Sequence, residues 1–79
     1  MTQYYQTKME LMELIGEKIS FINKRLFEEE NPTENELTEI ADAIVFLKDH
    51  KYLLTSQGLN QLEFFIRESE EALQKLRIR

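Results

Sequence analysis

Residues 3–30 read QYYQTKMELMELIGEKISFINKRLFEEE, and this stretch decides the fold. Gly16 is its only glycine, it contains no proline, and its apolar residues recur at the spacing of an α-helix. On a helical wheel most of these apolar residues fall within roughly 120°, which is typical of a helix that faces a hydrophobic core. The sequence therefore predicts one long amphipathic helix against which the rest of the chain folds.

The apolar arc of this first helix is wider than a single neighbouring helix needs. Leu14 and Phe21 lie on one flank of the main arc, and Met9 and Phe27 lie on the other. Two arrangements account for the width, because the helix either contacts two other helices of the same chain or meets a second chain. The two arrangements are compatible, so the pattern leaves both an intramolecular core and a homodimer open.

The break after the first helix is marked by Pro32, which lacks a backbone N–H and disfavours a helical conformation in the residue before it. Thr33 and Glu36 follow with the spacing of a capping box, in which each side chain bonds the other residue's backbone N–H. A second helix is therefore predicted over about residues 34–52. Its alanines, Ala41 and Ala43, would allow close approach to the first helix.

A third helix is predicted over about residues 56–76. Thr55 stands at the N-cap position, and Leu54 and Leu59 have the spacing of a hydrophobic staple around it. Residues 1–79 thus form a single domain, and the predicted fold is an all-α antiparallel three-helix bundle with a long first helix. A chain this short has a small core and no cysteine, and because oligomerisation commonly stabilises such chains, a dimer is expected.

Composition excludes several functional classes. The net charge of −5 disfavours direct nucleic-acid binding, which usually needs a basic face. No apolar run approaches the roughly 18 residues that a membrane helix requires, so we expect no membrane partner. The first residues lack the basic and apolar segments of a secretory signal, and a cytoplasmic location is expected.

Residues that could carry catalysis are scarce. His50 is the only histidine, cysteine is absent, and we expect His50 to be exposed on the polar side of the second helix. A zinc or catalytic site needs several converging ligands or partners, and the spacing provides none. Glycine occurs twice, which is too few for a phosphate-binding loop. We therefore predict a protein that is not an enzyme, with no catalytic, cofactor-binding or metal-binding residues and no cofactor.

The apolar residues outside the core stripes are more informative. They predict a protein-binding surface, because aromatic residues and methionine are enriched at interfaces. The predicted contact residues are Leu14, Phe21, Phe46 and Phe64. The favoured function is a non-enzymatic protein–protein interaction module of regulatory or adaptor type that acts through apolar helix faces as a homodimer.

An acidic patch around the first turn supports an alternative function. Carboxylates spaced along helices can imitate phosphates and fit a basic groove, to which their charge would steer them. The alternative is an acidic inhibitor, or nucleic-acid mimic, that occupies the basic groove of a nucleic-acid-binding protein. The residues of this predicted patch are Glu28, Glu29, Glu30, Glu34, Glu36, Glu39 and Asp42.

Overall fold

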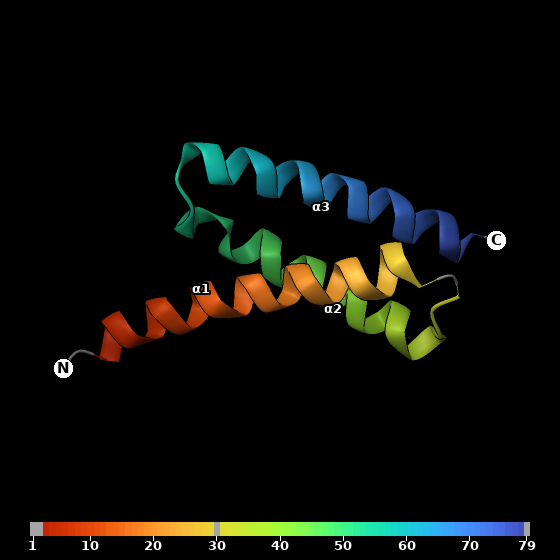
Figure 1. The fold of residues 1–79 in the computed structure, drawn as a ribbon, viewed down its shortest axis with the longest axis horizontal. Coiled ribbons are helices and arrows are strands. Elements are labelled where there is room, and N and C mark those ends of the chain that lie inside the picture. Colours follow the sequence, from red (N-terminus) through yellow and green to blue (C-terminus); the bar gives the residue numbers. More distant parts are fainter. Residues whose placement is uncertain (1–2, 30, 79) are drawn as a thin grey trace.

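Three helices form the structure, with no strand in the described part of the chain (Figure 1). The computed structural model describes the backbone of residues 3–29 and 31–78, and side chains from Thr7 onward within these ranges. The elements are α1 (Gln3–Ile22), η1 (Asn23–Glu28), α2 (Glu34–His50), η2 (Lys51–Leu53) and α3 (Ser56–Arg77). The predicted all-α three-helix bundle is confirmed.

The first helix changes its winding before it ends. After Ile22 the chain continues as a π-helix, η1, and the N–H of Glu29 donates to the carbonyl of Lys24 at 3.2 Å. The helix was predicted to run as one piece to about residue 30, but Glu29 is already extended, with φ −87° and ψ 145°. The wider π turn keeps Leu26 buried at the end of the bundle.

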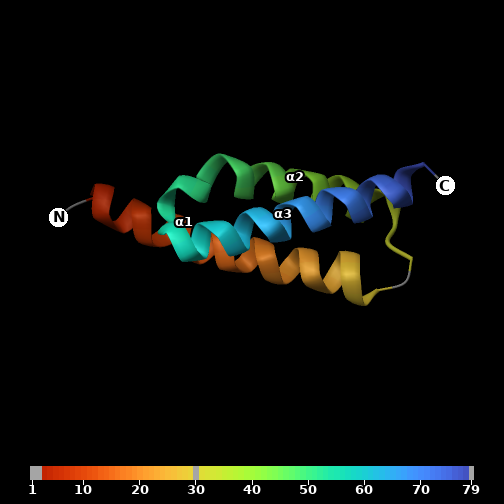
Figure 2. The ribbon, with the colours of Figure 1, turned by 90° about the horizontal axis from the view of Figure 1, so that it is seen from above.

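The second helix, and not the first, is the central helix of the bundle. α1 and α3 both pack along α2, and the first helix meets α3 mainly through η1 (Figures 1 and 2). The expectation that both alanines face the first helix is therefore wrong for one of them. Ala43 borders the groove between α2 and α1, whereas Ala41 borders the groove between α2 and α3.

One hydrophobic core joins the three helices. Ile22, Ile40 and Leu47 are completely buried within it. Ser69 of α3 is also completely buried, and its hydroxyl has no hydrogen-bond partner in the described part of the chain. The buried apolar residues are Ile15, Ile22, Leu26, Ile40, Ala43, Ile44, Leu47, Leu62, Ile66 and Leu73.

The molecule is elongated because the first helix is longer than its packing partners. The N-terminal end of α1 extends past the connection between α2 and α3 (Figures 1 and 2). The radius of gyration is 13.6 Å, against roughly 11.6 Å for a compact chain of this length. The first helix thus projects from the bundle at its N-terminal end, where Met9 is exposed.

Ion pairs connect the outer faces of the helices. Lys48 of α2 binds Glu70 of α3 at 2.9 Å, and Lys51 binds Glu63 at the same distance. The hydrogen bond from Lys48 to the Glu70 carboxylate raises the pKa of the lysine above its usual value. These pairs are solvent-exposed, so they orient α3 on α2 more than they stabilise the fold.

The N-terminus of α2 has the predicted cap, whereas that of α3 does not. The Thr33 hydroxyl accepts a bond from the N–H of Glu36 at 3.2 Å, and the Glu36 carboxylate accepts one from the N–H of Thr33 at 2.9 Å. Thr55 occupies the N-cap of α3, but its side chain makes no capping hydrogen bond. The carbonyls of both threonines accept the first intrahelical hydrogen bond of their helices, from the N–H of Leu37 at 2.9 Å and from that of Leu59 at 2.6 Å, so the two caps differ only in the side-chain bonds.

These two threonines form a matched test of the caps. We expect Thr33→Ala to lower the free energy of unfolding by about 1 kcal/mol, because the N–H of Glu36 loses the hydroxyl that accepts its hydrogen bond. Thr55→Ala should cost less than about 0.5 kcal/mol, as for an ordinary surface substitution. Urea unfolding followed by circular dichroism measures both changes, and equal losses would contradict the assigned capping box.

Candidate interaction surface

A cleft of about 420 Å³ lies between α1 and α3, on the side of the bundle that α2 does not cover. Apolar side chains make up most of its walls, and no charged residue lines it. The lining residues are Met12, Ile15, Gly16, Ile19, Leu54, Gly58, Gln61, Leu62 and Phe65. The cleft exists because two helices packed on the same central helix diverge from one another.

Both glycines of the chain border this cleft, Gly16 from α1 and Gly58 from α3. Neither is required by the backbone, because no described glycine has a positive φ. A Cβ at Gly16 would meet nothing within 4 Å, and one at Gly58 would meet only the Leu54 Cβ at 3.8 Å, an ordinary contact. A glycine inside a helix costs about 1 kcal/mol relative to alanine. The packing of the isolated chain therefore does not explain why glycine stands at Gly16.

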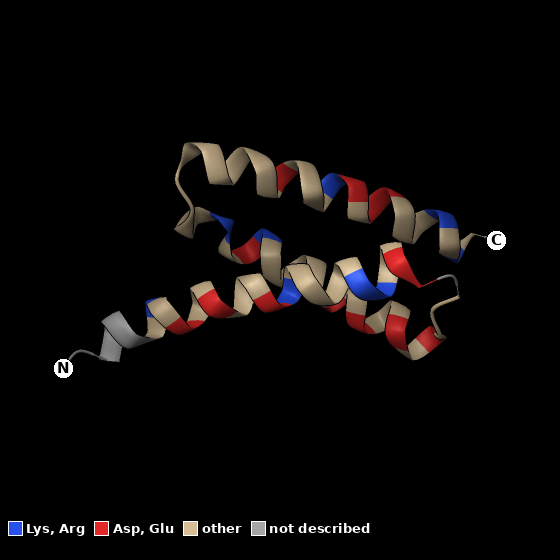
Figure 3. Cartoon of the chain, in the orientation of Figure 1, with Lys and Arg blue, Asp and Glu red and all other residues tan. Residues whose placement is uncertain are grey.

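The surface beside the cleft is depleted in charge. Residues 52–62 form a run of 11 uncharged residues, although 32% of the chain is charged. Figure 3 shows that the first turns of α3 carry no acidic or basic residue. Tyr52 at one end of the run is 69% exposed. Because the centres of protein interfaces are poor in charged residues and rich in aromatic ones, this composition favours a contact surface.

Two methionines continue the apolar surface along α1 toward its projecting end. Met9 is 55% exposed and Met12 is 39% exposed, and Met12 also lines the cleft. The expected apolar stripe of the first helix is therefore only partly used inside the chain. Methionine side chains are flexible and adapt to irregular partners, which suits them to a binding surface.

The four predicted contact residues do not lie on one surface. Leu14 and Phe21 are half-buried on α1, and Phe21 packs against the core. Phe46 is also half-buried against the core, whereas Phe64 of α3 is 58% exposed. Their place in an interface stays a prediction, and Phe64 is the one whose ring is mostly available to a partner.

Phe46 belongs to a small cluster at the end of α2. Its ring stacks on the imidazole of His50 with centroids 4.1 Å apart, and the ammonium of Lys18 lies 5.7 Å from its centroid. The Nδ1 of His50 lies 2.8 Å from the Phe46 carbonyl oxygen. His50 was expected to be exposed, but it is half-buried, because its ring folds back on its own helix. The described residues contain no cluster of metal-binding side chains around it or elsewhere.

The predicted acidic patch divides into two parts. The guanidinium of Arg25 binds the carboxylate of Glu29 at 2.6 Å and that of Glu36 at 3.3 Å, which neutralises part of the turn. Glu30 lies outside the described residues. Glu28 and Glu34 are exposed near this turn. Two of the carboxylates near the turn, those of Glu29 and Glu36, are thus already paired with Arg25.

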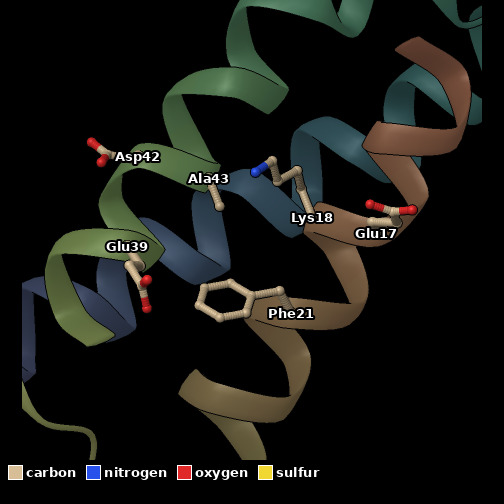
Figure 4. A pocket seen from close by; sticks show the side chains of 6 residues that line it. All are labelled: Glu17, Lys18, Phe21, Glu39, Asp42 and Ala43. Atoms are coloured by element: carbon tan, nitrogen blue, oxygen red, sulfur yellow. The ribbon is translucent and has the colours of Figure 1, made fainter. Parts of the chain in front are cut away.

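Glu39 and Asp42 line a separate groove of about 380 Å³ between α1 and α2 (Figure 4). Glu17 adds a third carboxylate from α1, and the ring of Phe21 points across the groove toward α2. No ion pair joins any of these three carboxylates to another described residue. The groove is therefore acidic, with one aromatic wall and one basic residue, Lys18.

Comparison with known proteins gives no further guide to the function, because the chain matched no family model, no curated protein and no solved structure. Within the described residues, none of the helices is both long enough and apolar enough to cross a membrane. Sequence reasoning had not identified the cleft, although its signals were present in the two glycines and the uncharged run.

Phe46 and Phe64 are predicted to differ in their contribution to stability. Phe46→Ala should lower the free energy of unfolding by about 2 kcal/mol, less than the loss at a fully buried phenylalanine, because its ring packs against the core and His50. Phe64→Ala should change it by no more than about 0.5 kcal/mol. Chemical denaturation of the two variants tests this, and a large loss at Phe64 would mean that its ring is part of the core in solution.

Proposed function

We propose that this chain is a non-enzymatic helical module that binds protein through the cleft between α1 and α3, with self-association as a homodimer. The observation that carries the proposal is the cleft itself, an apolar and uncharged opening that is continuous with exposed Met12. Its aliphatic and aromatic walls suit the apolar face of an amphipathic helix, as in other helix-in-groove contacts. Affinity would come from apolar burial in the cleft.

We propose a regulatory or adaptor role for this module, because a chain that binds through such a surface acts by changing which proteins are held together. The partner contacts would be apolar at the centre and charged at the rim, where exposed Glu13, Glu17 and Lys8 surround the methionines. A cytoplasmic location is part of the proposal, because the chain has no cysteine and so no disulfide of the kind common in small secreted domains.

The first test is the solution mass across a range of protein concentrations. The wild-type chain should change from a monomer of 9.5 kDa to a dimer as its concentration rises. The double variant Met9→Ser/Met12→Ser should stay monomeric at concentrations where the wild type is dimeric, because both side chains belong to the apolar surface. Light scattering measures the mass, and thermal unfolding confirms that the variant remains folded.

A suitable control is Val45→Ser, since Val45 is 54% exposed on α2, away from the cleft. This substitution should leave the dimer unchanged. If the methionine variant dimerises like the wild type, the contact uses another surface. A wild-type chain that stays monomeric at every concentration would remove self-association from the proposal.

The acidic groove supports a second candidate, an inhibitor that competes with nucleic acid for a basic protein. Glu17, Glu39 and Asp42 line one groove without an ion pair among the described residues, although the Glu17 carboxylate points away from α2 (Figure 4). Phe21 offers a ring face to a cation. This function would rest on charge, whereas binding in the cleft would rest on apolar burial. The two candidates therefore differ in their dependence on salt.

An arginine-rich peptide is a direct probe of the second candidate. Its binding to the chain, followed by calorimetry, should weaken steeply as salt rises from about 0.05 to 0.5 M, because screening shortens the reach of charge. Glu39→Gln/Asp42→Asn should weaken binding at low salt. Glu71→Gln, an exposed position on α3, is the control for general charge. Equal weakening by both variants would mean that the peptide responds to the net charge of the chain and does not bind specifically in the groove.

A further inference from the structure

We propose that the occupant of the cleft is α1 of a second copy of this chain, with Met12 of each copy seated on the bare backbone of Gly16 of the other. This inference rests on the proposed function and specifies its contact. It explains three features together: an open apolar cleft, a projecting helix with exposed methionines, and a glycine that the isolated chain does not require.

The exposed area of the chain agrees with one missing neighbour. The accessible surface is 5869 Å², whereas a compact monomer of this mass exposes about 5000 Å². The excess of roughly 800 Å² is about what one partner buries in an interface of standard size. Met9 and Met12, on the helix that projects from the bundle (Figures 1 and 2), contribute to this exposed surface.

The two parts of the contact are present on the same chain and form a continuous surface. Met12 belongs both to the exposed face of α1 and to the lining of the cleft. Two copies related by a two-fold axis therefore make the same contact twice, because α1 of each copy packs against the cleft of the other. In a two-fold dimer the contact between Met12 and Gly16 occurs twice. Met12 of the first copy meets Gly16 of the second, and Met12 of the second copy meets Gly16 of the first.

Charge selects this side of the molecule for a contact between identical chains. Each copy carries a net charge of −5, so two copies repel one another unless their acidic faces point apart. Glu39 and Asp42 lie in the groove between α1 and α2. The cleft, in contrast, is bordered by the uncharged residues 52–62, with Glu13 and Glu17 beside Gly16 at its edge on α1. Association through the cleft keeps charged residues at the rim.

Gly16 gives the contact its specificity. A side chain at this position would find open space within the isolated chain, so its absence matters only if something else fills that space. A glycine lets a second helix approach the backbone closely, and the long side chain of methionine fills the remaining room. Gly58 likewise lets the second helix approach the backbone of α3, which forms the opposite wall of the cleft.

The deciding experiment is to replace each glycine by alanine and to measure folding and association separately. Gly16→Ala should raise the melting temperature of the monomer by about 5 °C, since alanine favours the helix and meets no clash. The same substitution should raise the dimer dissociation constant about tenfold or more, because a Cβ occupies the seat of Met12. Gly58→Ala should also weaken the dimer.

Asn60→Ala is the matched control. Asn60 is exposed on α3, about 200° around the helix from Gly58, and so faces away from the cleft. It should stabilise the monomer through helix propensity without changing the dissociation constant. Sedimentation equilibrium gives the dissociation constants. The melting temperatures are measured at protein concentrations below these constants, because dimerisation itself raises the melting temperature.

Each outcome decides a different point. A wild-type dimer that Gly16→Ala leaves intact would overturn the seat at Gly16 while the proposed self-association stands. A wild-type chain that stays monomeric would overturn both the seat at Gly16 and the proposed self-association. Growth beyond a dimer would overturn the two-fold arrangement, because contacts that do not close continue to add copies. A more stable monomer with a weaker dimer supports the inference, because a glycine needed only for folding would give a less stable monomer.

Discussion

Burial of α2 on two sides is the constraint on which the rest of the structure depends. Ala41 and Ala43 border its apolar stripe on opposite sides, roughly 160° apart on the helix. A stripe of this width holds two neighbouring helices, and the small alanines let both approach closely. Ile40 and Leu47, at its centre, are completely buried. The other two helices are thus fixed by their contacts with α2 more than by contacts with each other.

The open side of the bundle follows from that arrangement. α1 and α3 converge where η1 meets α3, and Phe27 lies beside Phe65 there with ring centroids 6.2 Å apart. Away from this end α1 projects past the connection between α2 and α3 (Figure 1), and Met9 and Met12 of its N-terminal half stay exposed. A chain of 79 residues has little core to spare. Leaving apolar surface exposed is costly for so small a domain unless another molecule covers it.

Local signals in the sequence predicted the helices well, but not their arrangement. The capping box at Thr33 and the break at Pro32 are set by neighbouring residues, and the structure has α2 beginning where they indicate. The position of α2 at the centre depends on competition among three amphipathic helices, which a wheel for one helix does not resolve. The change to a π-helix after Ile22 was not predicted either, and that segment packs against both α2 and α3. Phe46 lies half-buried against the core, which a wheel for one helix does not resolve either, since Lys18 approaches its ring from another helix.

The candidate site differs from the fold in how its signals combine. Gly16 and Gly58 are far apart in sequence. In the sequence alone, each is interpreted as a glycine that a helix tolerates. Their meaning appears only when the fold brings them to one cleft and shows that alanine would fit at both positions. Alanine at position 16 would favour the helix and meet no clash, so the folded monomer gives no reason for the glycine. The proposed contact with another helix supplies one, because an approaching backbone or side chain makes use of the missing methyl group.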